Sequence, residues 1–159
     1  MKDKKKNRQD HRLGRYKLMG AEIDPRGFKK CVYCGEPANT VDHQPPISRI
    51  DDYESLGLAN ELYVLIPSCM DCNKLAGSVL HDSPIERLEY IKDSLEKRLK
   101  KYLNQVEWDA EELKDIGPNL RSKILEDSNK KLTAISRIEY YSGYDLIIDT
   151  AQELLYAPC

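Results

Sequence analysis

The sequence predicts an α+β protein, with a small strand–strand–helix unit stapled by zinc on four cysteines and a mostly helical C-terminal extension. The first observation is a pair of Cys-x-x-Cys motifs, Cys31/Cys34 and Cys69/Cys72, with 34 residues between them. The second is that the segment between these motifs contains two short strand signals and leads into a helix signal. The third is helical periodicity from Ser83 onwards.

The two cysteine pairs predict a structural metal site. Each pair closes a tight turn that offers two thiolates to one ion, and four sulfurs suit tetrahedral zinc. The spacing between the pairs is about double that of a zinc ribbon, so we expect the ion to clamp both ends of a subdomain. Iron in a rubredoxin-like site has similar ligands, but rubredoxin chains lack this long insert. Cys159 is left as a spare thiol.

Two strands and a helix are expected within and just after the cysteine-bounded segment. Residues 40–43 form a β-branched run that ends before two prolines, which cannot donate to a neighbouring strand. Residues 47–61 are expected to form a long loop with some helical tendency over 51–58. After it, residues 62–66 form the clearest strand in the chain, and Pro67 is expected to stop it. A helix should then run from about residue 69 to about residue 80.

The C-terminal half carries helix signals. Residues 83–86 combine a capping serine, a proline at the first helical position and a glutamate that completes the capping box. Apolar residues at helical spacing extend this helix to about residue 103. A long helix is expected over 118–142 and a last one over 145–156, and we expect this half to pack on the core or on a partner.

Length and charge suggest how the chain is organised. We expect a basic N-terminal arm at residues 1–27, a core at 28–82 and a helical extension at 83–159. Residues 1–30 hold eleven basic and four acidic residues, whereas the whole chain has a net charge of −2. Such an arm suits a phosphate backbone, and a solvated tail that only aids solubility has the same composition.

The sequence also gives expectations about location. The apolar runs are short, and the N-terminus is charged from Lys2 onwards without an apolar signal region. Because no export is expected, the five cysteines indicate four metal ligands and one spare thiol instead of disulfide bonds. We therefore expect a reducing, cytoplasmic compartment and no membrane partner.

The motif set resembles a known enzyme family. Cys-x-x-Cys, then Asp42-His43 and a Pro-Pro, then Cys-x-x-Cys followed at once by Asn73, is similar to the HNH (ββα-metal) endonucleases. The likeness is to their four-cysteine, zinc-stapled branch, which includes phage endonuclease VII, and it covers residues 28–80. One position departs from the pattern, because Asn60 stands nine residues before Cys69, where the family places its middle asparagine about seven before.

The resemblance implies a ββα-metal (HNH) core and metal-dependent hydrolysis of DNA phosphodiester bonds. His43 would be the general base, since imidazole titrates near neutral pH. Asp42 and Asn73 would hold a catalytic Mg²⁺ or Mn²⁺ through oxygen atoms. Asn60 would brace the loop that carries the histidine, and Cys31, Cys34, Cys69 and Cys72 would hold the structural zinc.

Substrate contacts and alternative functions complete the expectations. Lys29, Lys30, Arg49 and Lys74 are candidates for binding DNA phosphates, although surface lysines and arginines often bind nothing. One alternative is a non-catalytic zinc-stapled module that binds nucleic acid or acts as an adaptor. Another is an interaction protein whose helical half binds a protein partner or a second copy of the chain. Neither alternative needs oxygen ligands beside a histidine.

Overall fold

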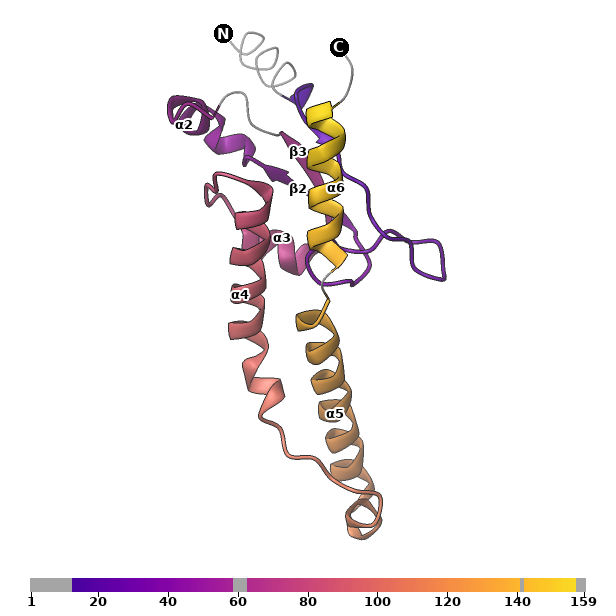
Figure 1. The fold of residues 1–159 in the computed structure, drawn as a ribbon. Coiled ribbons are helices and arrows are strands. Elements are labelled where there is room, and N and C mark those ends of the chain that lie inside the picture. The colour runs from indigo at the N-terminus through magenta and orange to yellow at the C-terminus, as the bar shows by residue number, and fades with distance from the viewer. Residues whose placement is uncertain (1–12, 59–62, 141, 157–159) are drawn as a thin grey trace, which may run out of the picture.

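A computed structural model describes residues 13–58, 63–140 and 142–156 of the chain. Within these residues the protein is α+β, with one three-stranded sheet, helices that lie next to the sheet, and helices that extend away from it (Figure 1). The elements in chain order are β1 (Lys17–Leu18), β2 (Thr40–Gln44), the 3₁₀ helix η1 (Ile47–Arg49), α2 (Ile50–Ser55), β3 (Val64–Ser68), α3 (Met70–Ala76), α4 (Pro84–Leu103), the 3₁₀ helix η2 (Glu112–Asp115), α5 (Pro118–Ile138) and α6 (Ser142–Tyr156).

The sheet has the strand order β1-β3-β2. β2 runs antiparallel to β3, with His43 opposite Leu65, and the short β1 runs parallel to β3 on its other side. Successive side chains of a strand point to opposite faces. In β2 this places Asp42 and Gln44 in the buried interior and leaves His43 half-buried on the other face.

The expectation that Pro67 stops the second strand is wrong. β3 includes Pro67, which lies opposite Val41 of β2. On the other side of β3, strand β1 pairs only as far as Leu65, so no described strand there requires the hydrogen bond that proline cannot donate. The carbonyl of Pro67 instead accepts a hydrogen bond from the backbone nitrogen of Val32 at 3.0 Å, which joins β3 to the first cysteine turn.

Helix α3 is shorter than the sequence indicated. It ends at Ala76 instead of near residue 80, because Gly77 adopts a positive φ of 51° that breaks the helical path. The start is as expected, with Cys69 as the N-cap and its sulfur accepting a hydrogen bond from the backbone nitrogen of Cys72. The segment between α3 and α4 is therefore a loop.

Helix α4 confirms the start predicted from the sequence. The side chain of Ser83 accepts a hydrogen bond from the backbone nitrogen of Glu86, and Pro84 occupies the first turn. The Glu86 carboxylate in turn accepts from the backbone nitrogen of Asp82 at 3.0 Å. The apolar stripe of α4 is buried, and its members are Leu88, Ile91, Leu95 and Leu99.

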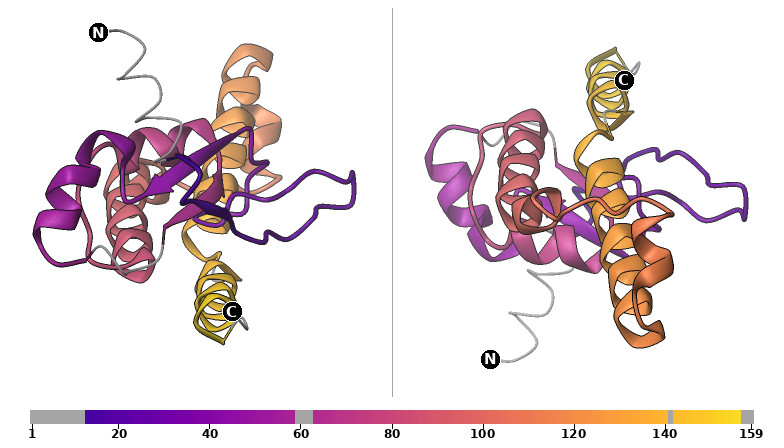
Figure 2. Two further views of the ribbon diagram at one scale, coloured as in Figure 1. Left: turned by 90° about the horizontal axis from the view of Figure 1, so that it is seen from above. Right: turned by 90° about the horizontal axis from the view of Figure 1, so that it is seen from below.

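The helical half packs on the sheet-bearing half through one shared core. Buried residues of the cysteine turns, β3, α3, α4, α5 and α6 form a single apolar cluster, which includes Val32, Ile66, Ile91 and Ile147. α4 and α5 lie side by side and are joined at the end distant from the sheet (Figure 1). The segment 21–30 projects sideways from the body (Figure 2). Within the described ranges, no helix has the length and apolar character needed to cross a membrane.

The junction of α5 and α6 packs tightly on the first cysteine turn. A Cβ built on Gly143 of α6 would lie 2.0 Å from the carbonyl oxygen of Val32. A Cβ on Gly35, which has a positive φ of 73°, would lie 2.8 Å from the ring of Tyr140. Both glycines therefore permit close approach between segments more than a hundred residues apart in sequence.

We expect Gly143→Ala to destabilise the protein by about 1–3 kcal/mol, because the added methyl group meets a backbone carbonyl that has little room to move. Urea unfolding of the metal-loaded protein measures the change. Gly20→Ala is the matched control, since nothing lies within 4 Å of its Cβ position, and its stability should stay within about 0.5 kcal/mol of the parent. Equal stability of the two variants would show that the α6 contact is loose.

Candidate metal centre and Asp-His site

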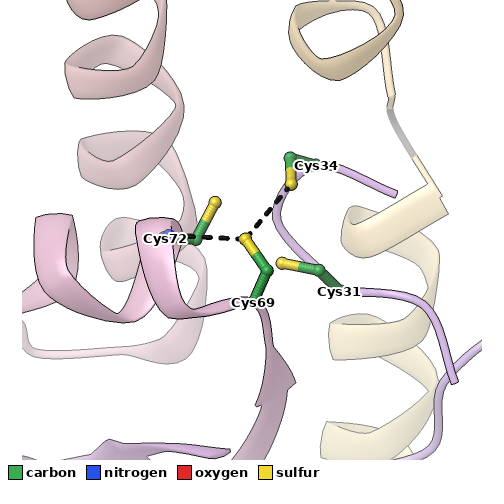
Figure 3. A group of neighbouring side chains, drawn as sticks. All are labelled: Cys31, Cys34, Cys69 and Cys72. Atoms are coloured by element: carbon green, nitrogen blue, oxygen red, sulfur yellow. Dashed lines mark hydrogen bonds between the residues drawn. The ribbon is translucent and has the colours of Figure 1, made fainter. Parts of the chain in front are cut away.

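The four motif cysteines converge on one point in the core. They come from the loop before β2 and from the start of α3, and their side chains point toward one another (Figure 3). All four are buried, and their sulfur atoms lie within 4.8 Å of one another. Cys34 Sγ and Cys69 Sγ are 3.7 Å apart, close to the distance of about 3.8 Å that zinc–sulfur bonds of about 2.3 Å give in a tetrahedron. The cluster could therefore hold a metal ion such as zinc.

Hydrogen bonds of the local backbone orient the cysteine side chains. In the first turn, the backbone nitrogens of Cys34 and Gly35 both donate to the carbonyl of Cys31, at 3.3 and 2.9 Å. In the second, Cys69 caps α3, where the helix N-terminus favours a thiolate. Hydrogen bonds among the four thiols lower the pKa of Cys69 and Cys34 and raise the pKa of Cys31 and Cys72.

Asp42 lies inside the core and its carboxylate is fully occupied. One oxygen accepts hydrogen bonds from Tyr33 Oη at 2.6 Å and Arg87 Nε at 2.7 Å. The other accepts from Arg87 Nη2 at 2.7 Å and from the backbone nitrogen of His43 at 2.8 Å. Four hydrogen bonds are about the full capacity of a carboxylate. The Arg87 side chain is 0% exposed and that of Asp42 4%, so the pair is sealed from solvent.

This arrangement does not fit the expectation that Asp42 is a ligand of Mg²⁺ or Mn²⁺. A divalent ion would have to displace one of the donors of Asp42, and Arg87 is also held by the carbonyls of Val79 and Gly77 at 2.9 and 3.1 Å. Asp42 in this structure is therefore an internal ion-pair partner that joins β2 to α4.

Sequence reasoning missed Arg87, although a signal was present. Arg87 lies four residues before Ile91 and next to Leu88, on the apolar stripe of the predicted helix. A charged residue at such a position must find a buried partner of opposite charge. Asp42 is the partner in the structure.

His43 occupies the opposite face of β2 and is half-buried. Its ring packs edge-on against Tyr16, with ring centroids 5.2 Å apart. Burial lowers the pKa of His43 below its usual value of 6.5, and the nearby Asp42 opposes this shift only in part. Within the described residues neither ring nitrogen of His43 makes a hydrogen bond, so a neutral imidazole is present that can accept a proton.

Asn73 connects α3 to the strand that carries Asp42 and His43. Its Nδ2 donates to Thr40 Oγ1 and to the carbonyl of Val41, both at 3.2 Å. Because Cys72 precedes it directly, the cysteine cluster fixes where this amide lies. Among the described residues, Asn73 Oδ1 accepts no hydrogen bond and remains the candidate ligand atom.

The predicted phosphate-binding residues fall into two groups. Arg49 pairs with Asp52 on the surface, and Lys30 pairs with Glu22 at 2.9 Å beside the ring of Tyr140. Lys29 and Lys74 are exposed, and their ammonium groups have no ion-pair partner among the described residues. Asn60, the arm at residues 1–12 and Cys159 lie outside the described residues.

Two cations of the helical half lie near the sulfur cluster and were not anticipated. Arg137 Nη2 is 4.0 Å from Cys72 Sγ. Lys92 is partly buried on the adjacent face of α4, and the charges of Cys34, Cys72 and Cys31 act on it. Nothing in the sequence identified them, because both follow the ordinary polar pattern of a helix.

Comparisons of the chain with protein families, with curated proteins and with solved structures gave no match. What the site does is therefore argued from its own residues and their geometry.

Purified protein should contain about one zinc ion per chain, and Cys72→Ser should lose that ion together with folded structure. Elemental analysis and circular dichroism measure the two effects. Cys159→Ser is the control, since it removes a thiol that the motif does not use, and this variant should keep the ion. Well-folded protein without any bound metal would exclude the structural role of the cluster.

We expect Arg87→Met to destabilise the metal-loaded protein by about 3–5 kcal/mol, because it leaves the carboxylate of Asp42 buried without its counter-charge. Urea unfolding again measures the change. In contrast, Arg49→Met removes the exposed pair with Asp52 and should cost less than about 1 kcal/mol. The double variant Asp42→Leu/Arg87→Met should recover most of the loss, and its failure to do so would assign the effect to packing of Arg87 instead of charge.

Proposed function

We propose that this chain is an endonuclease of the HNH type that hydrolyses DNA phosphodiester bonds, with His43 as the general base and a structural zinc on the cysteine cluster. The observation that carries this proposal is the pair of hydrogen bonds from Asn73 to β2, which brings the residue after the second cysteine pair against the strand that holds Asp42 and His43. The three residues of the motif thus lie on one hairpin and the helix that follows it.

The chemistry assigned to His43 is proton abstraction from water. The oxygen of a water attacks phosphorus in line while the bond from phosphorus to the 3′ oxygen breaks, and the leaving 3′ oxygen takes a proton from solvent. The attacking water must lose a proton, and a neutral imidazole of pKa near the working pH is suited to take it. Burial lowers the pKa of His43, so the imidazole is neutral at pH 7. The contact with Tyr16 holds the ring in place while its nitrogens remain without a protein partner among the described residues.

The substrate class follows from charge and from the resemblance of the motif. Lys74 follows Asn73 directly, is exposed, and suits a phosphate next to the bond that is cut. The basic N-terminal segment adds a second, sequence-independent attraction for the DNA backbone. By its likeness to the HNH family the enzyme would leave 5′-phosphate and 3′-hydroxyl ends.

The resemblance to HNH enzymes also implies a catalytic divalent ion. Both carboxylate oxygens of Asp42, however, already accept hydrogen bonds, so neither is left to bind the ion. Proton transfer is therefore assigned to His43, and no step is assigned to Mg²⁺ or Mn²⁺. The role assigned to Asp42 is to position the backbone of His43, through the hydrogen bond to its nitrogen.

A second candidate function is a zinc-stapled nucleic-acid-binding or adaptor module without catalysis. The observation that favours it is the same buried pair of Asp42 and Arg87, since a module needs the motif only as a structural element. Both candidates predict zinc and DNA binding. They differ in whether the bound DNA is cut.

If His43 is the base, His43→Ala should reduce the cleavage of supercoiled plasmid by about a hundredfold or more while DNA affinity and zinc content stay unchanged. His81→Ala is the matched control, because His81 is also partly buried with a lowered pKa but lies outside the motif. The assay is run with Mg²⁺, with Mn²⁺ and with EDTA. DNA binding without cleavage in every arm would support the non-catalytic module instead.

The pH dependence of cleavage should carry the signature of a base with a lowered pKa. Protonated imidazole cannot accept the proton of water, so the rate should fall as the pH falls through the pKa of His43. Since burial places that pKa below 6.5, the rate should be level near pH 7 and decline only in more acidic buffer. A rate that changes with pH in the same way for the parent and for His43→Ala would remove this residue from the chemistry.

A further inference from the structure

The charge of the cysteine cluster requires compensation when a metal is bound. Four thiolates around a divalent ion carry a net charge of about −2, and this cluster is buried in the core. A buried net charge is costly unless charges of opposite sign and hydrogen bonds accompany it. The sheet-bearing segment offers little help, since residues 31–82 contain eight acidic residues and only two basic ones, Arg49 and Lys74.

Arg137 of α5 directs its guanidinium at the cluster. Its Nη2 lies 4.0 Å from Cys72 Sγ, and its Nη1 lies 3.5 Å from a carboxylate oxygen of Asp71, which precedes Cys72. The side chain is 12% exposed, and its Nε is buried without a hydrogen-bond partner. Burial alone would lower the pKa of Arg137, but the neighbouring sulfurs of Cys34 and Cys72 raise it. The guanidinium of Arg137 thus faces the sulfur of Cys72 and the carboxylate of Asp71 at the same time.

Lys92 of α4 approaches from the adjacent helix. Its ammonium group donates to the carbonyl of Ile138 at 3.2 Å and to the carbonyl of Tyr140, at the C-terminal end of α5. Burial lowers the pKa of Lys92, and the sulfurs of Cys34, Cys72 and Cys31 oppose that shift. Lys92 therefore ties α4 to the end of α5.

The same junction is packed on the first cysteine turn. Tyr140 lies against Gly35, directly after Cys34, and Gly143 lies against Val32, directly after Cys31. The end of α5 and the start of α6 thus pack on the turn that carries Cys31 and Cys34.

We propose that Arg137 is a counter-charge of the metal-loaded cysteine cluster, and that metal binding thereby holds the junction of α5 and α6 on the core. Loss of the metal with reprotonation of the thiols removes the negative charge beside Arg137 and leaves its guanidinium facing neutral sulfurs, with the half-exposed Asp71 as its ion-pair partner. The helical half then loses part of the attraction that docks it. This inference does not depend on whether the protein cuts DNA.

The test compares the metal affinity of charge-removing and charge-keeping variants of the full chain. Metal-free protein is titrated with Co²⁺, whose absorption bands report thiolate ligation, and the Co²⁺ is then displaced with Zn²⁺ to obtain the zinc affinity. Partners that support metal ligands typically contribute tenfold to a hundredfold in affinity. We therefore expect Arg137→Gln to weaken zinc binding by about 10- to 100-fold and Arg137→Lys to retain most of the affinity.

Arg98→Gln is the matched control. Arg98 is a cation of α4 that also pairs with Asp71, at 4.0 Å, but its side chain is about half exposed and no sulfur contact is described for it. Its loss should leave zinc affinity unchanged. If Arg137→Gln does not fold, Arg137→Met, an unbranched and uncharged side chain, is compared with Arg137→Lys in the same way.

A second readout follows the docking itself. In metal-loaded Arg137→Gln, backbone amides of residues 134–140 and 143–147 should exchange with deuterium faster than in the parent, whereas the first turns of α4 should stay protected. Two results would overturn the proposal. One is equal zinc affinity in all variants, and the other is an Arg137→Lys variant as weak as Arg137→Gln, which would show that shape instead of charge is responsible.

Discussion

Convergence of four sulfur atoms inside the core is the constraint on which the rest of this structure depends. Cys31 and Cys34 lie before the first strand of the hairpin, and Cys69 and Cys72 lie at the start of the helix after its second strand. Bringing the two pairs together closes the whole intervening segment into a loop, which costs conformational entropy that a small sheet could hardly offset alone. A bound metal supplies this free energy directly, because the ligands come from both ends of the loop.

The side chains of Asp42 and His43, which are neighbours in sequence, lie on opposite faces of strand β2. Asp42 points into the core and meets Arg87, whereas His43 points to the other face and meets Tyr16. Alternation along a strand makes this outcome unavoidable unless the strand ends at the dipeptide, and β2 extends one residue further, to Gln44. The hydrogen bond from the His43 nitrogen to the Asp42 carboxylate still couples the two, so the buried ion pair sets the backbone position of the histidine.

Much of the fold could be predicted from local sequence, and the errors have two different physical origins. The start of α4 at Ser83-Pro84 was predictable because a capping box acts through residues within one turn. The inclusion of Pro67 in β3 was not, because it depends on where the short strand β1 ends. The early end of α3 was predictable from Gly77, because glycine commonly ends a helix. Strand β1 was not predictable, because two residues are too short for a sequence pattern.

The residues of the candidate site were also predictable from the sequence only in part. The cysteine ligands were predictable from spacing, since each pair lies within a single turn. Arg87 had a weak signal as a charge on an apolar stripe, and Arg137 and Lys92 had none. These three cations act across distances in sequence that no periodicity reports, and only the packing of helices on the core brings them to their partners.

Arg87 and Arg137 show that the helical half completes the sheet-bearing half electrostatically. Residues 31–82 contain eight acidic residues and two basic ones, yet they hold two buried anionic centres, the Asp42 carboxylate and the cysteine cluster. Buried anions need cations of low exposure, and neither Arg49 nor Lys74, both outside the core, contacts these centres in the described part of the chain. The helices supply Arg87 to the first centre and Arg137 to the second. The sheet-bearing half and the helices therefore depend on each other for charge balance, and a truncation after α3 would remove the cations that both anionic centres require.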